Sequence, residues 1–128
     1  MARILVVDDE ETDRTFQQVV LEGAGHEIFI AEDGGEALRA YAGRGIEVVL
    51  TDLQMPKVHG LELIMALREF SPRPVIIAIS GTGAPQLAMA HALGAERTLT
   101  KPVDPDELIA AVAETLAERA ASGTSGGD

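Results

Sequence analysis

Short apolar runs alternate with amphipathic stretches along the whole chain. Four of the runs are continuous and rich in β-branched residues, a pattern typical of strands that are buried on both faces. These runs are Ile4–Val7, Ile28–Ile30, Val48–Leu50 and Val75–Ile79. Thr98–Thr100 is a weaker candidate for a further strand. The hydrophobic pattern therefore predicts a series of short strands.

Between these runs, apolar residues recur at three-to-four-residue spacing, which predicts a helix after each strand. The clearest helix follows Asp104, a candidate cap, with Pro105 in the first turn and Glu107 three residues after the cap. Asp33 and Glu36 have the form of a second capping box. The other helices are expected around Phe16, Val19, Val20 and Ala24, around Leu61, Ile64 and Leu67, and around Leu87 and Ala90.

Strands that alternate with helices in this way make a (βα)5 chain of the α/β class. Continuously apolar strands need cover on both faces, so we expect a doubly wound, five-stranded parallel sheet with helices on each side. Residues 1–121 are expected to form one domain. The segment 122–128 contains no large apolar residue and is expected to be a flexible Gly/Ser-rich tail.

Composition narrows the classes of function. The 128 residues include 21 acidic and 10 basic side chains, for a formal net charge of −11. A surface of this charge repels phosphate backbones and attracts divalent cations, so we expect no direct contact with nucleic acid. The absence of cysteine excludes disulfides, thiolate metal sites and cysteine nucleophiles. The first apolar run is too short for a signal peptide or a membrane span, so the expected location is cytoplasmic, without membrane insertion.

Polar side chains follow four of the predicted strands. Asp8 and Asp9 follow the first, Asp52 the third, Ser80 the fourth and Lys101 the fifth. Sites in open parallel sheets form at the carboxyl ends of the strands. Taken singly, each residue has an ordinary explanation as a helix cap, a turn residue or a solvated charge. Their coincidence at four strand ends favours a single site.

The residue types in this set suit phosphoryl chemistry. Carboxylates without histidine or cysteine partners are hard oxygen ligands, which Mg²⁺ prefers. A lysine supplies a point charge for a phosphoryl group, and a hydroxyl supplies a hydrogen bond. A carboxylate such as that of Asp52 can itself be the nucleophile and become an acyl phosphate.

The order and spacing of these residues resemble the receiver domain of two-component response regulators, the CheY-like superfamily. The resemblance covers residues 2–119. It rests on Asp8-Asp9, on Asp52 within Leu50-Thr51-Asp52-Leu53-Gln54-Met55-Pro56 with Gly60 beyond, on Ser80, and on Lys101-Pro102. It implies a flavodoxin-like fold with strand order 2-1-3-4-5.

The resemblance also implies a role for each residue. Asp52 is the phosphoacceptor, Lys101 binds the phosphoryl group, and Ser80 is the hydroxyl that moves toward it. The Mg²⁺ ligands are Asp9 directly, Asp8 through water, Asp52, and the backbone carbonyl of Gln54. The Lys101-Pro102 bond is expected to be cis. The family's switch often pairs the moving hydroxyl with an aromatic residue. Thr98 stands at the aromatic position, so the aromatic partner is absent from this chain.

A receiver implies signalling by a phosphoprotein and not a turnover enzyme. The expected partners are a histidine kinase or histidine phosphotransfer protein, which contacts Phe16 and Val19 of the first helix, and a downstream protein target. The chain is then a stand-alone regulator, a phosphorelay member or a receiver cut from a longer protein.

Two other functions remain open. One is a Mg²⁺-dependent phosphohydrolase that forms an aspartyl phosphate. Such enzymes usually place the nucleophile after the first strand, with a second aspartate two residues on, where this chain has Gln54. The other is a degenerate receiver that binds partners without phosphorylation, and the intact acidic set with Lys101 argues against it.

Overall fold

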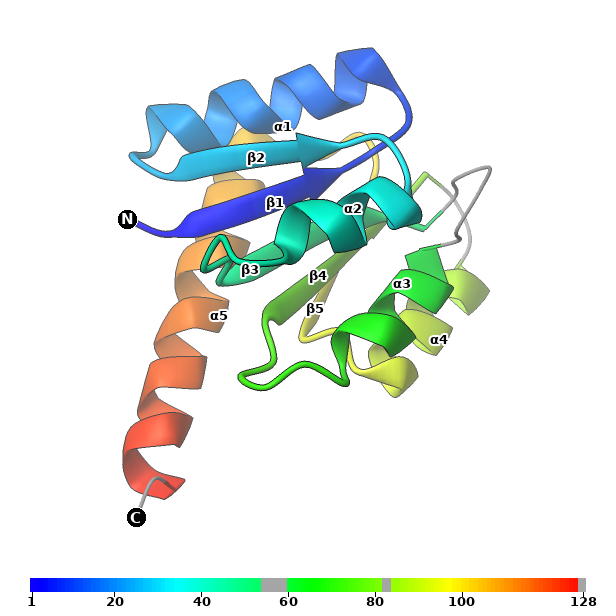
Figure 1. Cartoon of the computed structure of the whole chain (residues 1–128). Helices are drawn as coiled ribbons and strands as arrows, with labels where there is room; N and C mark the ends of the chain where they lie inside the picture. Colours follow the sequence, from blue (N-terminus) through cyan, green and yellow to red (C-terminus); the bar gives the residue numbers. More distant parts are fainter. Residues whose placement is uncertain (54–59, 82–83, 127–128) are drawn as a thin grey trace.

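The computed structural model describes residues 1–53, 60–81 and 84–126. Strands and helices alternate along the chain (Figure 1): β1 (Arg3–Val7), α1 (Glu11–Gly23), β2 (Glu27–Ala31), α2 (Gly34–Tyr41), β3 (Val48–Asp52), α3 (Gly60–Leu67), β4 (Val75–Ser80), α4 (Ala84–Leu93), β5 (Arg97–Thr100) and α5 (Pro105–Gly126). The strands form one parallel sheet in the order β2-β1-β3-β4-β5. The predicted fold class and strand order are confirmed.

The three central strands carry the continuous apolar runs. Every residue of β3 and β4 is buried, as are Ile4–Val7 of β1. The edge strands β2 and β5 are only partly buried. Helices cover both faces of the sheet, so a central strand has no solvent-facing side and needs no polar residue at alternate positions. This explains why the strands appear in the sequence as unbroken apolar runs.

Side chains of one strand alternate between two hydrophobic cores. Leu5 and Val7 of β1 lie in the core beneath α2, α3 and α4, with Leu63, Ile64 and Leu67 of α3. Ile4 and Val6 lie in the opposite core, beneath α1 and α5. That second core receives Leu21 from α1 and Leu108, Ala111 and Val112 from α5. In Figure 1, α1 runs along the top beside β2 and α5 passes behind the strands, whereas α2 lies in front of them and α3 and α4 lie at the lower right.

Both predicted helix caps are present. Asp104 accepts a hydrogen bond from the backbone N–H of Glu107 at 3.0 Å, and Asp33 accepts one from the N–H of Glu36 at 2.8 Å. The side chain of Glu36 reaches back to the N–H of Glu32 at 2.7 Å, one residue before the cap. Aspartate at this position satisfies one of the free N–H groups of the first helical turn.

The buried face of α1 differs from the one that its apolar residues suggest. Phe16 is 38% exposed and Val19 is 61% exposed, whereas Gln17 is 2% exposed and Leu21 is fully buried. The helix packs on the sheet through Leu21, and the same helical face brings the Gln17 amide to the end of β1. The amide nitrogen of this buried side chain donates a hydrogen bond to Asp8.

The bounds of α5 extend to Gly126, into the segment for which a flexible tail is predicted. The domain boundary at residue 121 stays a prediction. Within the described ranges, no helix is both long enough and apolar enough to cross a membrane.

Candidate functional site

The carboxyl ends of β1, β3, β4 and β5 meet at one edge of the sheet. Asp8 directly follows β1, and Asp52 and Ser80 are the last residues of β3 and β4. The parallel register sets Val7 beside Thr51, Asp52 beside Ile79, and Ser80 beside Thr100. Strand ends in register bring their following residues to the same edge, which places Lys101 next to this set.

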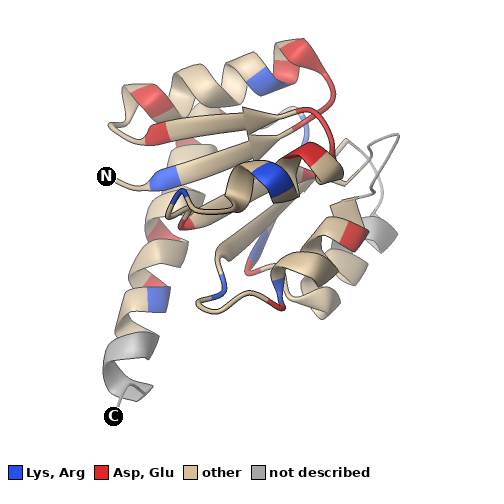
Figure 2. Ribbon diagram, viewed as in Figure 1, with Lys and Arg blue, Asp and Glu red and all other residues tan. Residues whose placement is uncertain are grey.

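Acidic residues gather at this end of the molecule. Figure 2 shows them where β1 and β2 end and where α1 and α2 begin. They are Asp8, Asp9, Glu10, Glu11 and Asp13 after β1, and Glu32, Asp33 and Glu36 after β2. The summed negative charge favours a cation at this edge of the sheet.

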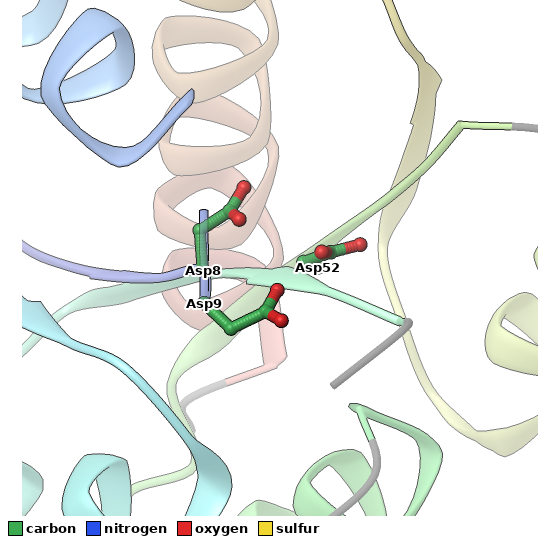
Figure 3. Close-up of side chains that lie close together, drawn as sticks. All are labelled: Asp8, Asp9 and Asp52. Atoms are coloured by element: carbon green, nitrogen blue, oxygen red, sulfur yellow. The ribbon is translucent and has the colours of Figure 1, made fainter. Parts of the chain in front are cut away.

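Asp8, Asp9 and Asp52 form the centre of the site (Figure 3). One carboxylate oxygen of each residue lies within 4.8 Å of the corresponding oxygens of the other two. Asp8 is fully buried and Asp52 is 4% exposed, whereas Asp9 is exposed to solvent. Carboxylates at this spacing repel one another, and their oxygens are the donors that Mg²⁺ takes. The donor set therefore fits a hard divalent cation that also keeps open positions toward solvent.

Asp8 is held by donors from the start and the body of α1 and from the residue that follows β5. Its Oδ1 accepts the backbone N–H of Glu10 at 2.9 Å. Its Oδ2 accepts from Nε2 of Gln17 at 3.2 Å and from Nζ of Lys101 at 3.3 Å. A buried carboxylate needs such hydrogen-bond partners to offset its lost solvation. Gln17 was not a candidate from the sequence, because a polar residue on a helix gives no sign that it is buried.

Lys101 sits among three carboxylates. Its Nζ lies 2.9 Å from Oδ2 of Asp13, 3.3 Å from Asp8 and 3.5 Å from Asp52. Burial works against its charge, but the hydrogen bond to Asp13 and the charges of Asp8 and Asp52 outweigh that effect and raise the pKa of Lys101 above its usual value. The side chain therefore remains an ammonium ion throughout the neutral pH range.

Asp13 is the second site residue that sequence reasoning missed. The available signal was its place one helical turn after Asp9, which puts both near the start of α1. An acidic residue in the first turn of a helix is common for reasons unrelated to any site. Only the position of Lys101 distinguishes Asp13 from its neighbours.

Ser80 and Gly60 complete the described surroundings. Ser80 is fully buried, and its carbonyl accepts the N–H of Lys101 at 2.9 Å. A Cβ on Gly60 would collide with the carbonyl oxygen of Asp52 and lie 2.6 Å from Cα of Leu53. Glycine at this position lets α3 start directly against the end of β3. The expected cis Lys101-Pro102 bond is present.

One candidate falls outside the described residues. Gln54, whose carbonyl is a predicted metal ligand, lies in the segment 54–59. Its role stays a prediction.

Comparisons with known proteins show the family to which the chain belongs. Residues 4–113 match the family model of the response regulator receiver domain. Over 116 residues, 87% of this chain, the sequence is 40% identical to the CAI-1 autoinducer sensor kinase/phosphatase CqsS of Vibrio cholerae. Over 114 residues, 89% of this chain, it is 32% identical to the DNA-binding response regulator MtrA of Mycolicibacterium smegmatis. The matched region spans 17% of the first protein and half of the second.

The fold is also that of a solved structure. A response regulator receiver domain protein from Clostridium thermocellum superposes with a TM-score of 0.87 and 31% sequence identity. The match covers 93% of this chain and 97% of that one.

Proposed function

Since the chain belongs to the response regulator receiver family, we propose that Asp52 accepts a phosphoryl group from a phosphohistidine donor and that the modified chain signals by changing shape. The observation that carries this proposal is the position of the Lys101 ammonium. It lies 3.5 Å from Asp52 and 3.3 Å from Asp8, at the edge where the three aspartates converge. A nucleophilic carboxylate, a fixed cation and a set of metal ligands thus share one edge of the sheet.

Asp8, Asp9 and Asp52, with the carbonyl of Gln54, would hold Mg²⁺. When bound, the ion would neutralise charge on the phosphoryl oxygens and on the aspartates. The support for this assignment is the all-oxygen donor set and its spacing.

In the transfer step, a carboxylate oxygen of Asp52 attacks the phosphorus atom of the donor. A new O–P bond forms while the P–N bond to the donor imidazole breaks. The electron pair passes to the imidazole nitrogen, and the imidazole leaves neutral when its other nitrogen carries a proton. Lys101 stabilises negative charge on the phosphoryl oxygens, since its raised pKa keeps it cationic.

The response then depends on Ser80 and on the loops around it. Ser80 is buried at the end of β4, next to the strand that leads to Lys101. Its hydroxyl would turn toward the phosphoryl group and shift an existing two-state equilibrium. Thr98 lies on β5 where many relatives carry an aromatic residue, so the switch in this chain uses the hydroxyl without an aromatic partner.

The partners follow from this chemistry. The phosphoryl donor is a histidine kinase or a phosphotransfer protein, and the exposed Phe16 and Val19 on α1 offer it an apolar contact. A downstream protein reads the switched state. One relative is named a DNA-binding regulator, and this chain matches only half of it. The expectation of no nucleic-acid contact therefore rests on net charge alone.

We favour a signalling role over enzymatic turnover, and the matches give the phosphohydrolase alternative no support.

Phosphorylation by acetyl phosphate, read by intact mass, tests this function. The wild-type chain should gain one phosphoryl group in Mg²⁺ and none without it. Asp52→Asn should gain none, whereas Asp104→Asn, a matched change at the cap of α5 and outside the cluster of three aspartates, should behave as wild type. An unmodified wild-type chain, under conditions that modify a control receiver, would contradict the proposal. Rapid donor hydrolysis without an adduct would instead support the phosphohydrolase.

A further inference from the structure

Among the described residues, three carboxylates lie within 4.0 Å of the Lys101 ammonium. The nearest of them is the one that does not belong to the cluster of Asp8, Asp9 and Asp52. Asp13 on α1 lies at 2.9 Å, compared with 3.3 Å for Asp8 and 3.5 Å for Asp52. Asp13 is not part of the cluster of aspartates that could hold a metal ion. Its contact with Lys101 therefore has to be explained separately.

The ammonium group has three N–H donors and three carboxylate neighbours. Asp8 and Asp13 each accept a hydrogen bond from the ammonium. Once Asp52 is phosphorylated, one phosphoryl oxygen takes over the contact of Asp52 with Lys101. A second phosphoryl oxygen that bonds with Lys101 must displace Asp8 or Asp13, and these two carboxylates differ in what the loss of the lysine costs.

Asp13 is the neighbour that can be released at least cost. Its side chain is 40% exposed, whereas the side chains of Asp8 and Asp52 are 0% and 5% exposed. Water can solvate the carboxylate of Asp13 as soon as the lysine leaves. A buried carboxylate has no such replacement, and removing its cationic partner is costly. Asp8 also keeps its bonds to the Glu10 N–H and the Gln17 amide, which hold it in place.

We propose that Asp13 is a positioning residue that competes with the phosphoryl group for Lys101. In the unphosphorylated chain, Asp13 holds the ammonium toward α1. When Asp52 is phosphorylated, the ammonium exchanges Asp13 for a phosphoryl oxygen, and the carboxylate of Asp13 is released. This inference rests on the proposed function, because it needs a phosphoryl group on Asp52.

The exchange also changes the surface of α1. Asp13 and Lys101 both line a hollow of about 280 Å³ with Phe16, Pro102 and Val103. In the unphosphorylated chain the two charges in this hollow neutralise each other. After the exchange, Asp13 contributes an unpaired negative charge beside the exposed ring of Phe16. The charge on the surface of α1 therefore differs between the unphosphorylated and the phosphorylated chain.

Binding of beryllofluoride, a stand-in for the phosphoryl group, tests the competition. At saturating Mg²⁺, Asp13→Asn should bind the analogue about two- to fivefold more tightly than wild type, the range of one partly exposed ion pair. Asp13→Glu keeps the competing charge and should return toward wild type. Glu11→Gln is the matched control, because it removes one exposed charge from the same first turn of α1 and should leave the affinity unchanged.

Lysine NMR gives a readout that a merely structural effect would not move. The chain contains two lysines, Lys57 and Lys101, so ¹⁵N-lysine labelling yields two ammonium signals, and Lys57→Arg assigns them. In Asp13→Asn the free-state signal of Lys101 should move toward its position in the beryllofluoride complex. In Glu11→Gln it should stay in place.

Equal or weaker analogue binding by both Asp13→Asn and Asp13→Ala would overturn the inference. So would a Lys101 signal that does not respond to Asp13→Asn. If the wild-type chain itself neither binds the analogue nor forms the acyl phosphate, the proposed function has failed and not the competition alone. The wild-type measurement thus separates the two failures.

Discussion

At the scale of single residues, His26 provides a contact whose strength depends on pH. The backbone N–H of Ala2 donates a hydrogen bond to Nδ1 of His26 over 3.0 Å. Burial, followed by the positive amino terminus, lowers the pKa of His26 below its usual 6.5, and Glu47 offsets part of this effect. A ring nitrogen accepts a hydrogen bond only while it carries no proton.

We therefore expect the contribution of His26 to stability to be present above pH 6.5 and to be lost as the pH falls through its lowered pKa. Urea unfolding of wild type and His26→Gln should show a difference on the order of 0.5 kcal/mol at about pH 8, and a smaller one at about pH 5.5. A difference that grows on acidification would contradict this assignment.

The site divides into residues that the sequence could predict and residues that it could not. Asp8, Asp9, Asp52 and Lys101 were predictable because each follows an apolar strand, and parallel strands bring their ends together. Gln17 was not, since it depends on the rotation of α1 about its axis. Asp13 likewise resembles any acidic residue in a first helical turn until the position of Lys101 is known.

At the scale of elements, strands were easier to predict than the orientation of helices. Strands β1, β3 and β4 are covered on both faces, so their burial follows from composition alone. A helix buries one stripe, and on α1 two large apolar residues, Phe16 and Val19, lie outside it. Apolar periodicity thus located α1 but did not fix which side faces the sheet.

The predicted cap of α5, Asp104, should contribute to the stability of the fold. Leu108 and Val112 of this helix fill the core beneath β1 and β3. Fraying of the first turn of α5 would therefore loosen contacts in that core. Asp104→Ala removes the acceptor for the N–H of Glu107 and should lower the free energy of unfolding by about 1 kcal/mol. Asp104→Asn retains a capping oxygen and should cost much less. Equal losses in the two variants, measured by urea unfolding, would show that capping is not the cause.

At the scale of the whole molecule, the formal net charge is −11, and the acidic residues are spread over several elements. One group of them lies where β1 and β2 end (Figure 2). Two aspartates of the central cluster are buried there, and Lys101 is the cation placed among them. The free folded state thus contains repulsion that a divalent cation would relieve, and an unfolded chain would bind that cation weakly.

Mg²⁺ should consequently stabilise the fold through mass action. At ten times its dissociation constant, the ion should add about 1.4 kcal/mol, which raises the midpoint of thermal unfolding by roughly 4–7 °C for a domain of this size. Asp9→Asn removes an exposed ligand, with little packing to lose, and should abolish most of the shift. Glu22→Gln removes one charge at the far end of α1 and should retain it. Because NaCl at equal ionic strength screens repulsion without occupying a site, an equal shift with NaCl would mean that the aspartates bind no specific ion.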